Sequence, residues 1–115
     1  MRMWMTSPKI MCRQHLIGEY REMFTFLGSL KKQISMQGYL QNNLFEPLSI
    51  LSRFNELRNE MLRRGYNPKK EFIYNESLIQ YLGESSIQTK VDVEKSLEDL
   101  LCRCEECRNR FFEIF

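Results

Sequence analysis

Apolar residues recur at helical spacing in the first third of the chain. One set of them lies three or four positions apart: Leu16, Tyr20, Met23, Leu27 and Leu30. At about 100° per residue, this spacing places them on one side of a helix. Ser7 and Pro8 suit an N-cap and a first helical position, and Gly38 suits a helix end. The pattern predicts a helix over about residues 7–38.

Three further helices are predicted along the rest of the chain. An apolar face indicates one over about residues 44–64, with Gly65 as its end. The stretch "NESLIQYLG" (75–83) is typical of a short capped helix, and a terminal helix is expected from about Asp92. No alternating strand pattern occurs. We therefore expect an all-α fold, a compact single domain (1–115) of three or four helices with long irregular connections.

Composition limits the class of protein. The chain has 115 residues, of which 43% are hydrophobic, enough for one compact core but not for two. It contains no run of roughly 18 apolar residues such as a membrane span needs, and no apolar segment resembling a signal peptide near its start. We expect an intracellular monomer that is not embedded in a membrane.

Charge is distributed unevenly along the chain. Residues 1–70 hold 12 Lys/Arg and 5 Asp/Glu, a net charge of +7, whereas residues 71–115 hold 5 Lys/Arg and 10 Asp/Glu, a net charge of −5. A basic part next to an acidic part favours a polyanion partner for the first 70 residues. Two solvated faces with no binding role are the alternative.

The segment "RQHLIGEYRE" (13–22) concentrates groups that handle protons. His15, Glu19 and Glu22 share one stripe of the predicted helix, and Gly18 lies between them. A missing side chain there would let a ligand approach the backbone, although close helix packing explains a glycine equally well. His15 and Glu19 could also bind a metal at i, i+4, but no second histidine accompanies them.

Three motifs in this region match a known family. The opening "MRMW", the segment "CRQHLIGEYRE" and the stretch "RNEMLRRGYN" (58–67) resemble the pyrimidine-dimer DNA glycosylases of the endonuclease V type. The resemblance covers about residues 1–70. It implies a small helical fold and a repair enzyme, a glycosylase with AP-lyase activity, whose partner is ultraviolet-damaged double-stranded DNA.

The resemblance also implies roles for individual residues. The α-amine of Met1 is the nucleophile, which forms an imine with the sugar of the damaged nucleotide, and Glu22 is the acid/base partner. Arg2, Arg21 and His15 line the site. From their charge, Arg2, Arg13 and Arg21 are expected to bind the phosphates that flank the lesion.

Other residues allow two interpretations. A wider DNA surface could include Arg53, Arg63, Arg64, Lys69 and Lys70, whose alternative roles are solubility and helix capping. Trp4 could stack at the opened duplex or lie in the core. The cysteines Cys12, Cys102, Cys104 and Cys107 could bind zinc or an iron–sulfur cluster, but C-x-C-x2-C is not a standard ligand spacing. We interpret them as free thiols and expect no metal or cofactor.

Two departures from the family leave other functions open. The region after Glu22 reads "MFTFLG", where members carry a further arginine or histidine, and the chain ends in the acidic "CEECRNRFFEIF" rather than a basic tail. A DNA-binding or structural relative without catalysis is one alternative. A helical protein-interaction module is the other.

Overall fold

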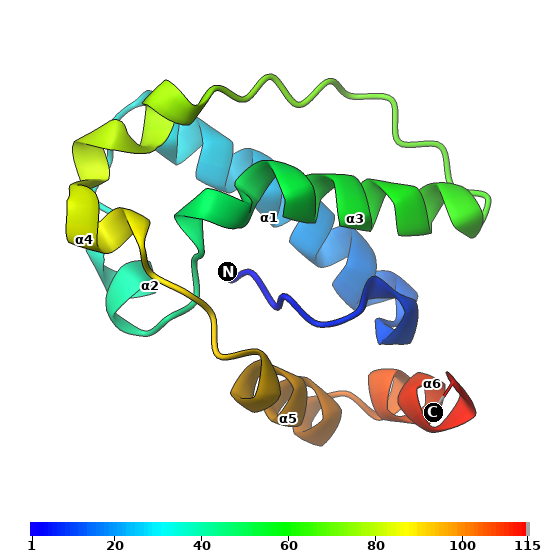
Figure 1. Ribbon diagram of the computed structural model, residues 1–115. Coiled ribbons are helices and arrows are strands. Elements are labelled where there is room, and N and C mark those ends of the chain that lie inside the picture. The colour runs from blue at the N-terminus through cyan, green and yellow to red at the C-terminus, as the bar shows by residue number, and fades with distance from the viewer. Residues whose placement is uncertain (115) are drawn as a thin grey trace.

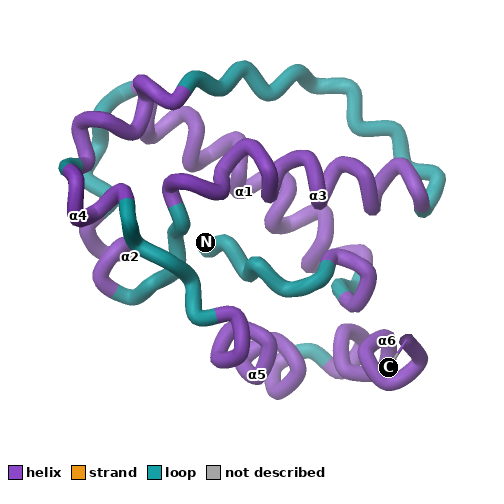
Figure 2. Tube along the Cα trace, in the orientation of Figure 1, coloured by secondary structure: helices purple, strands orange, loops and turns teal. Residues whose placement is uncertain are grey.

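The computed structural model describes residues 1–114, which form helices and connecting segments without a strand (Figures 1 and 2). The α-helices are α1 (Arg13–Lys31), α2 (Gln37–Gln41), α3 (Ile50–Arg63), α4 (Glu84–Ile87), α5 (Val93–Arg103) and α6 (Glu105–Ile114). Three 3-10 helices accompany them: η1 (Pro8–Ile10), η2 (Pro47–Ser49) and η3 (Glu76–Leu82). The all-α prediction is confirmed, with helices that are shorter and more numerous than the three or four expected.

The helix predicted over residues 7–38 is wrong at both ends. Pro8 begins only the short η1, and the chain is extended at Cys12 before α1 starts. α1 ends without a glycine, because Gln33 takes the left-handed conformation (φ +54°) and the Ile34 amide donates back to the Ser29 carbonyl at 3.0 Å. Gly38 lies inside α2 instead.

The helix predicted over residues 44–64 has the expected end and a later start. Gly65 follows α3 with φ +86°, a conformation that favours glycine. The start is delayed because Pro47 restricts the residue before it, and Glu46 is extended. A short 3-10 turn, η2, then leads into α3.

The tail contains the helices predicted for it, an unpredicted short helix (α4) and one additional break. Asn75 caps η3 by accepting the Ser77 amide at 2.9 Å, and Gly83 ends it with φ +91°. Asp92 caps α5 by accepting the Lys95 amide at 3.2 Å. The predicted terminal helix is interrupted at Cys104, whose backbone is extended, so that α5 and α6 are separate helices.

α1 and α3 pack against each other, and aromatic rings fill their interface (Figure 1). Tyr20 and Phe24 of α1 meet Phe54 of α3, with ring centroids 5.3 and 5.5 Å away. The connection after α3 runs back along that helix, and Phe72 stacks on Phe54 at 4.1 Å. This contact fixes the long irregular connection to the core, since stacked rings bury large apolar areas.

A buried ion pair joins α1, α3 and the segment before them. Arg53 donates to the carboxylate of Glu19 from Nε at 2.5 Å and from Nη2 at 2.8 Å, and both side chains are excluded from solvent. Nη1 of Arg53 donates to the Thr6 carbonyl at 2.7 Å. Because each partner is satisfied in this bidentate arrangement, the two charges can remain in the core.

The N-terminal segment lies between the α1–α3 pair and α5 (Figure 1). The Met3 amide donates to the Leu44 carbonyl at 2.8 Å, and the Ser96 hydroxyl of α5 donates to the Trp4 carbonyl at 2.5 Å. Met3 and Trp4 are buried. The first residues are thus held by both the basic part and the acidic part of the chain. Across residues 1–114, no helix is long and apolar enough to cross a bilayer.

Candidate active site at the N-terminus

The backbone of the N-terminus lies against α1 at Glu22. The amide of Arg2 donates a hydrogen bond to Oε2 of Glu22 at 3.1 Å. Only the Cα and carbonyl carbon of Met1 separate this amide from the α-amino group. Met1 is 41% exposed, whereas Met3 has no exposure, so the chain leaves the core at its first residue. The structure therefore brings together the two predicted catalytic residues, Met1 and Glu22.

A pocket of about 530 Å³ opens beside Met1. Such a volume is within the range of small-molecule sites. The turn after α2 and one side of α5 form its walls, and the charges that line it have both signs. The lining residues are Met1, Arg2, Asn42, Asn43, Leu44, Asp92, Lys95, Ser96, Asp99 and Arg103.

The side chain of Arg2 is held by the tail. Its guanidinium donates to the Ser96 hydroxyl at 3.2 Å, lies 3.5 Å from the Asp99 carboxylate and stacks 3.9 Å above the Trp4 ring. Burial lowers the pKa of Arg2 from its ordinary value, an effect that Asp99 opposes. Arg2 is therefore already paired, and phosphate binding by it requires exchange of these partners.

The stripe of His15, Glu19 and Glu22 does not act as one site. Glu22 faces the N-terminal backbone, whereas Glu19 is bound to Arg53 in the core. His15 lies at the other end of the stripe, with its Nδ1 3.2 Å from the sulfur of Cys12. The expected single chemical face is corrected to three separate environments, because the packing of three different segments against α1 divides it.

Gly18 lies half-buried between these environments. A Cβ placed on Gly18 would meet no atom within 4 Å, so close helix packing does not explain this glycine. Of the predicted phosphate ligands, Arg13 and Arg21 are exposed on α1. The guanidinium of Arg13 lies 5.6 Å from the centre of the Tyr66 ring. Arg13 and Arg21 are thus accessible to a polyanion.

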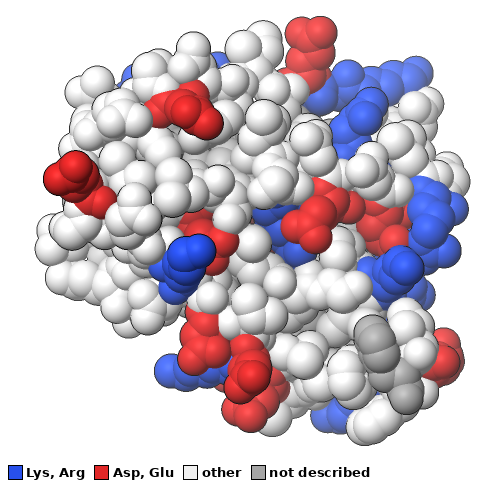
Figure 3. All heavy atoms as spheres, in the orientation of Figure 1, with Lys and Arg blue, Asp and Glu red and all other residues white. Residues whose placement is uncertain are grey.

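One residue of the predicted wider DNA surface is not on the surface. Arg53 is fully buried in the ion pair with Glu19, so that prediction is wrong. The sequence pattern gave no sign of this, because the arginine and its partner belong to different helices. In the view of Figure 3, Lys and Arg side chains gather where α3 ends, and Asp and Glu side chains stand out over α5.

Arg63 and Arg64 share one acidic partner at the end of α3. Both donate to the carboxylate of Glu60, at distances of 2.5 to 2.8 Å. Burial raises the pKa of Glu60, but these hydrogen bonds and charges hold it below its ordinary value. Arg64 also donates to the carbonyls of Pro8 and Met11, at 3.0 and 2.7 Å. The contacts of Arg64 thus support the segment before α1. The Arg63 side chain, in contrast, is 57% exposed.

A comparison with protein families gives a match for the part of the chain that holds Met1 and Glu22. A family model described as pyrimidine dimer DNA glycosylase matches residues 1–74. The chain belongs to the pyrimidine dimer DNA glycosylase family. Comparisons with curated proteins and with solved structures give no match.

The part of the chain that matches the glycosylase family holds the N-terminus, α1 and α3. The match ends in the connection before η3, so α5 and α6 lie outside it. Ser96 and Asp99 of α5 nevertheless contact Arg2, and the sequence did not predict their place in the site. More than ninety positions separate them from Arg2, and no motif links the two regions. Trp4 is 7% exposed and occupies the core.

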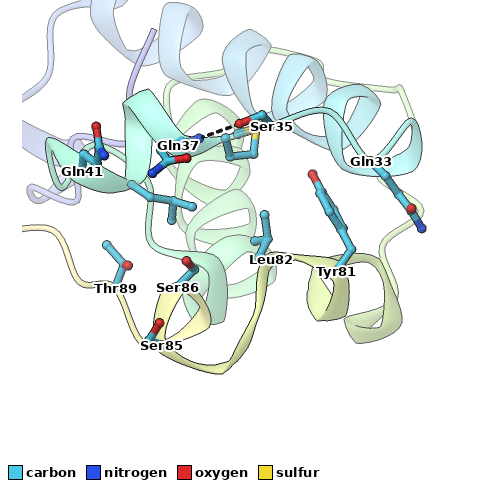
Figure 4. A pocket seen from close by; sticks show the side chains of 11 residues that line it. Gln33, Ser35, Gln37, Gln41, Tyr81, Leu82, Ser85, Ser86 and Thr89 are labelled. Carbon is cyan, nitrogen blue, oxygen red and sulfur yellow. Dashed lines mark hydrogen bonds between the residues drawn. The ribbon is translucent and has the colours of Figure 1, made fainter.

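A second hollow in this member of the glycosylase family lies away from the N-terminus. Its volume is about 500 Å³, and no Lys, Arg, Asp or Glu lines it (Figure 4). The hydroxyl of Tyr81, at its rim, donates to the Ile34 carbonyl at 2.7 Å. Ser35, Ser86 and Thr89 provide hydroxyl groups without a base beside them. This hollow offers neither a nucleophile nor a phosphate site.

The cysteines take positions that differ from the predicted set of four. Cys12, Cys104 and Cys107 lie together with His15, where α1 and α6 begin. Cys102 is exposed and stands outside this group. One feature of the sequence could have predicted this group. Residues 12–15 read Cys-x2-His and residues 104–107 read Cys-x2-Cys, so the two pairs of side chains have the same spacing.

Proposed function

We propose that the protein is a DNA glycosylase with AP-lyase activity, which excises pyrimidine dimers from ultraviolet-damaged duplex DNA. The α-amine of Met1 is the nucleophile and Glu22 is the acid/base. The observation that carries the proposal is the 3.1 Å hydrogen bond from the Arg2 amide to the Glu22 carboxylate, in a chain of this family. A carboxylate next to an exposed amine forms the pair that imine chemistry needs.

An α-amine suits this reaction better than a lysine side chain. α-Amines have an ordinary pKa near 8 and lysine side chains one of about 10.4, so more of the α-amine is free base near neutral pH. The free base carries the lone pair that attacks carbon. Met1 is exposed beside the pocket next to Arg2, which gives an extrahelical nucleotide access to it.

The reaction breaks the glycosidic bond first. The nitrogen of Met1 attacks C1′ of the damaged nucleotide, and the bond to the base breaks with its electron pair leaving on the base, which takes up a proton. The nitrogen then loses one of its two protons as the sugar ring opens, the ring oxygen takes up a proton, and a cationic imine forms. Removal of a proton from C2′ expels the 3′-phosphate and cuts the strand. Water finally hydrolyses the imine.

In this proposal Glu22 serves these proton transfers. As a carboxylate it stabilises the cationic imine, and it can accept and return the protons that move around the opening sugar. Its half-buried position on α1 keeps it fixed beside the N-terminus. Because the target carbon is inside a duplex, the enzyme must also unstack and extrude a nucleotide.

The exposed basic residues supply the DNA surface in this proposal. Arg13 and Arg21 lie on the same helix as Glu22 and bind phosphates on either side of the lesion. The ring of His15, a further residue predicted to line the substrate site, lies beside Cys12 and Trp4. We propose that the protein acts as a monomer on intracellular DNA.

One observation favours a second function, a DNA-binding relative without catalysis. Arg2 is bound to Asp99 of α5, and the acidic side chains of Asp92 and Asp99 line the pocket beside Met1. Negative charge there opposes the approach of DNA phosphates. In this second function the basic surface binds duplex DNA and no imine forms.

Borohydride trapping distinguishes these functions. Borohydride reduces an imine to a stable amine, so the enzyme should become covalently joined to dimer-containing or abasic duplex. A chain extended by one residue before Met1 should lose most of the trapping if its extra residue displaces the amine, and an acetylated N-terminus should lose it completely. Peptide mapping of the adduct to Met1 is the expected result. Mapping to a lysine would overturn the mechanism, and DNA binding without trapping would favour the second function.

A further inference from the structure

Four side chains with metal-binding atoms meet where α1 and α6 begin. They are Cys12, His15, Cys104 and Cys107, and their ligand atoms all lie within 4.8 Å of one another. The sulfur of Cys12 is 3.2 Å from Nδ1 of His15 and 3.8 Å from the sulfur of Cys104. The sulfur of Cys107 is 3.7 Å from the same nitrogen.

We propose that these four side chains bind one zinc ion. Zinc in structural sites is tetrahedral, with Zn–S distances of about 2.3 Å and Zn–N distances of about 2.0–2.1 Å. The edges of such a tetrahedron are about 3.8 Å between sulfurs and about 3.6 Å between sulfur and nitrogen. The observed sulfur–sulfur and sulfur–nitrogen distances lie close to these edge lengths. Small rotations of the side chains would therefore complete the coordination.

Both ligand pairs have the same local geometry. Cys12 is the N-cap of α1, and its sulfur accepts the amide of His15 at 3.4 Å. Cys104 directly precedes α6, and its sulfur accepts the amide of Cys107 at 3.4 Å. Each pair therefore presents its ligands from the first turn of a helix, three residues apart, as in the Cys-x2-Cys turns of zinc sites.

The three sulfurs lie beside hydrogen-bond donors and helix N-termini, although burial raises the pKa of the Cys107 thiol. The sulfur of Cys107 accepts the amide of Cys12 at 3.1 Å, so all three sulfurs accept a backbone N–H. The N-terminal ends of α1 and α6 also carry partial positive charge. Hydrogen bonds and positive helix ends stabilise negative sulfur, the form that binds zinc.

Other chemistry at this cluster fits the geometry less well. An iron–sulfur cluster distributes its ligands over several iron atoms, which needs wider spacing than four atoms within 4.8 Å. A disulfide between Cys12 and Cys104 would need its sulfurs at about 2.05 Å, and they lie 3.8 Å apart. It would also leave His15 and Cys107 without a role.

The zinc ion would join two parts of the chain. Cys12 and His15 lie in the region that matches the family, and Cys104 and Cys107 lie in the tail beyond it. All four positions are filled by protein, so the site is structural rather than catalytic. By holding α6 against the start of α1, the ion would keep α5 near Arg2. This inference does not rest on the proposed enzymatic activity.

The wild-type protein allows a direct test without any variant. After expression with zinc and gel filtration, elemental analysis should give one zinc per chain. X-ray absorption at the zinc edge should give three sulfur neighbours and one nitrogen neighbour. Zinc with only oxygen and nitrogen neighbours would overturn the proposal, and so would a metal-free chain that binds no added zinc under reducing conditions.

Variants with a matched control identify the ligands. Cobalt(II) replacing zinc should give the intense visible bands of tetrahedral thiolate coordination, and Cys102→Ser should retain them because Cys102 is exposed outside the group. Cys104→Ser and His15→Ala should lose or strongly weaken them, whereas His15→Cys, which supplies a fourth sulfur, should restore tight binding. Equal losses in Cys102→Ser and Cys104→Ser would overturn the assignment. So would a Cys12–Cys104 disulfide in the freshly purified chain.

Discussion

The carboxylate of Glu22 accepts a hydrogen bond from the backbone amide of Arg2 at 3.1 Å, although twenty positions separate the two residues. The side chain of Arg2 points elsewhere, to Ser96 and Asp99 of α5. One residue thus connects α1 with the tail, through its backbone on one side and its guanidinium on the other. The position of the α-amine depends on both contacts.

Glu22→Gln should separate catalysis from binding. Glutamine has the same shape and keeps an oxygen that can accept the Arg2 amide, so the fold and the affinity for undamaged duplex should change little. Strand cleavage should fall by at least about 100-fold, as expected for loss of a positioned acid/base group. Single-turnover cleavage of a dimer-containing duplex measures this. Glu98→Gln, an exposed change on α5, is the control, and near-normal cleavage by Glu22→Gln would move the role to another group.

Arg21→Ala should weaken binding to damaged and intact duplex equally. Loss of one phosphate contact lowers the slope of log affinity against log salt concentration by about one unit. Lys90→Ala removes an exposed positive charge from the tail and should leave the slope unchanged. Salt titrations of both variants on one undamaged oligonucleotide provide the comparison. A larger effect of Lys90→Ala would place the DNA surface on the wrong part of the chain.

Glu19→Leu should destabilise the fold strongly, because it leaves the Arg53 charge buried without its partner. Breaking a buried pair in this way costs about 3–5 kcal/mol. Glu56 is exposed and 3.8 Å from Arg53, so Glu56→Gln should cost less than about 1 kcal/mol. Urea denaturation gives both free energies of unfolding. The double variant Glu19→Leu/Arg53→Met should recover most of the loss, and failure to do so would indicate that Arg53 matters through its bond to Thr6.

Glu60→Gln should alter the dependence of stability on pH. The pKa of Glu60 is held below its ordinary value of 4.5 in the folded protein. A lowered pKa contributes stability above the ordinary value, and this is lost as the pH falls through the folded pKa. The free-energy difference between wild type and Glu60→Gln should therefore shrink from neutral pH to well below 4.5. An equal difference at every pH would contradict this, and the exposed Glu71→Gln serves as control.

Local sequence determined the class of fold and some of the helix ends. Apolar spacing identified α1 and α3, Asn75 and Asp92 marked helix starts, and Gly65 marked the end of α3. These signals work because capping and backbone conformation depend on neighbouring residues. The motifs around Glu22 likewise identified the family without tertiary information.

Tertiary packing decided which polar groups meet. Arg53 is an ordinary helix arginine in sequence, and only the crossing of α1 and α3 buries it against Glu19. The break at Cys104 turns α6 toward Cys12, which brings together four ligand atoms from both ends of the chain. Such contacts depend on distances between segments far apart in sequence. Local spacing therefore determines which residues share one face of a helix. Only tertiary packing determines which residues of other segments that face contacts.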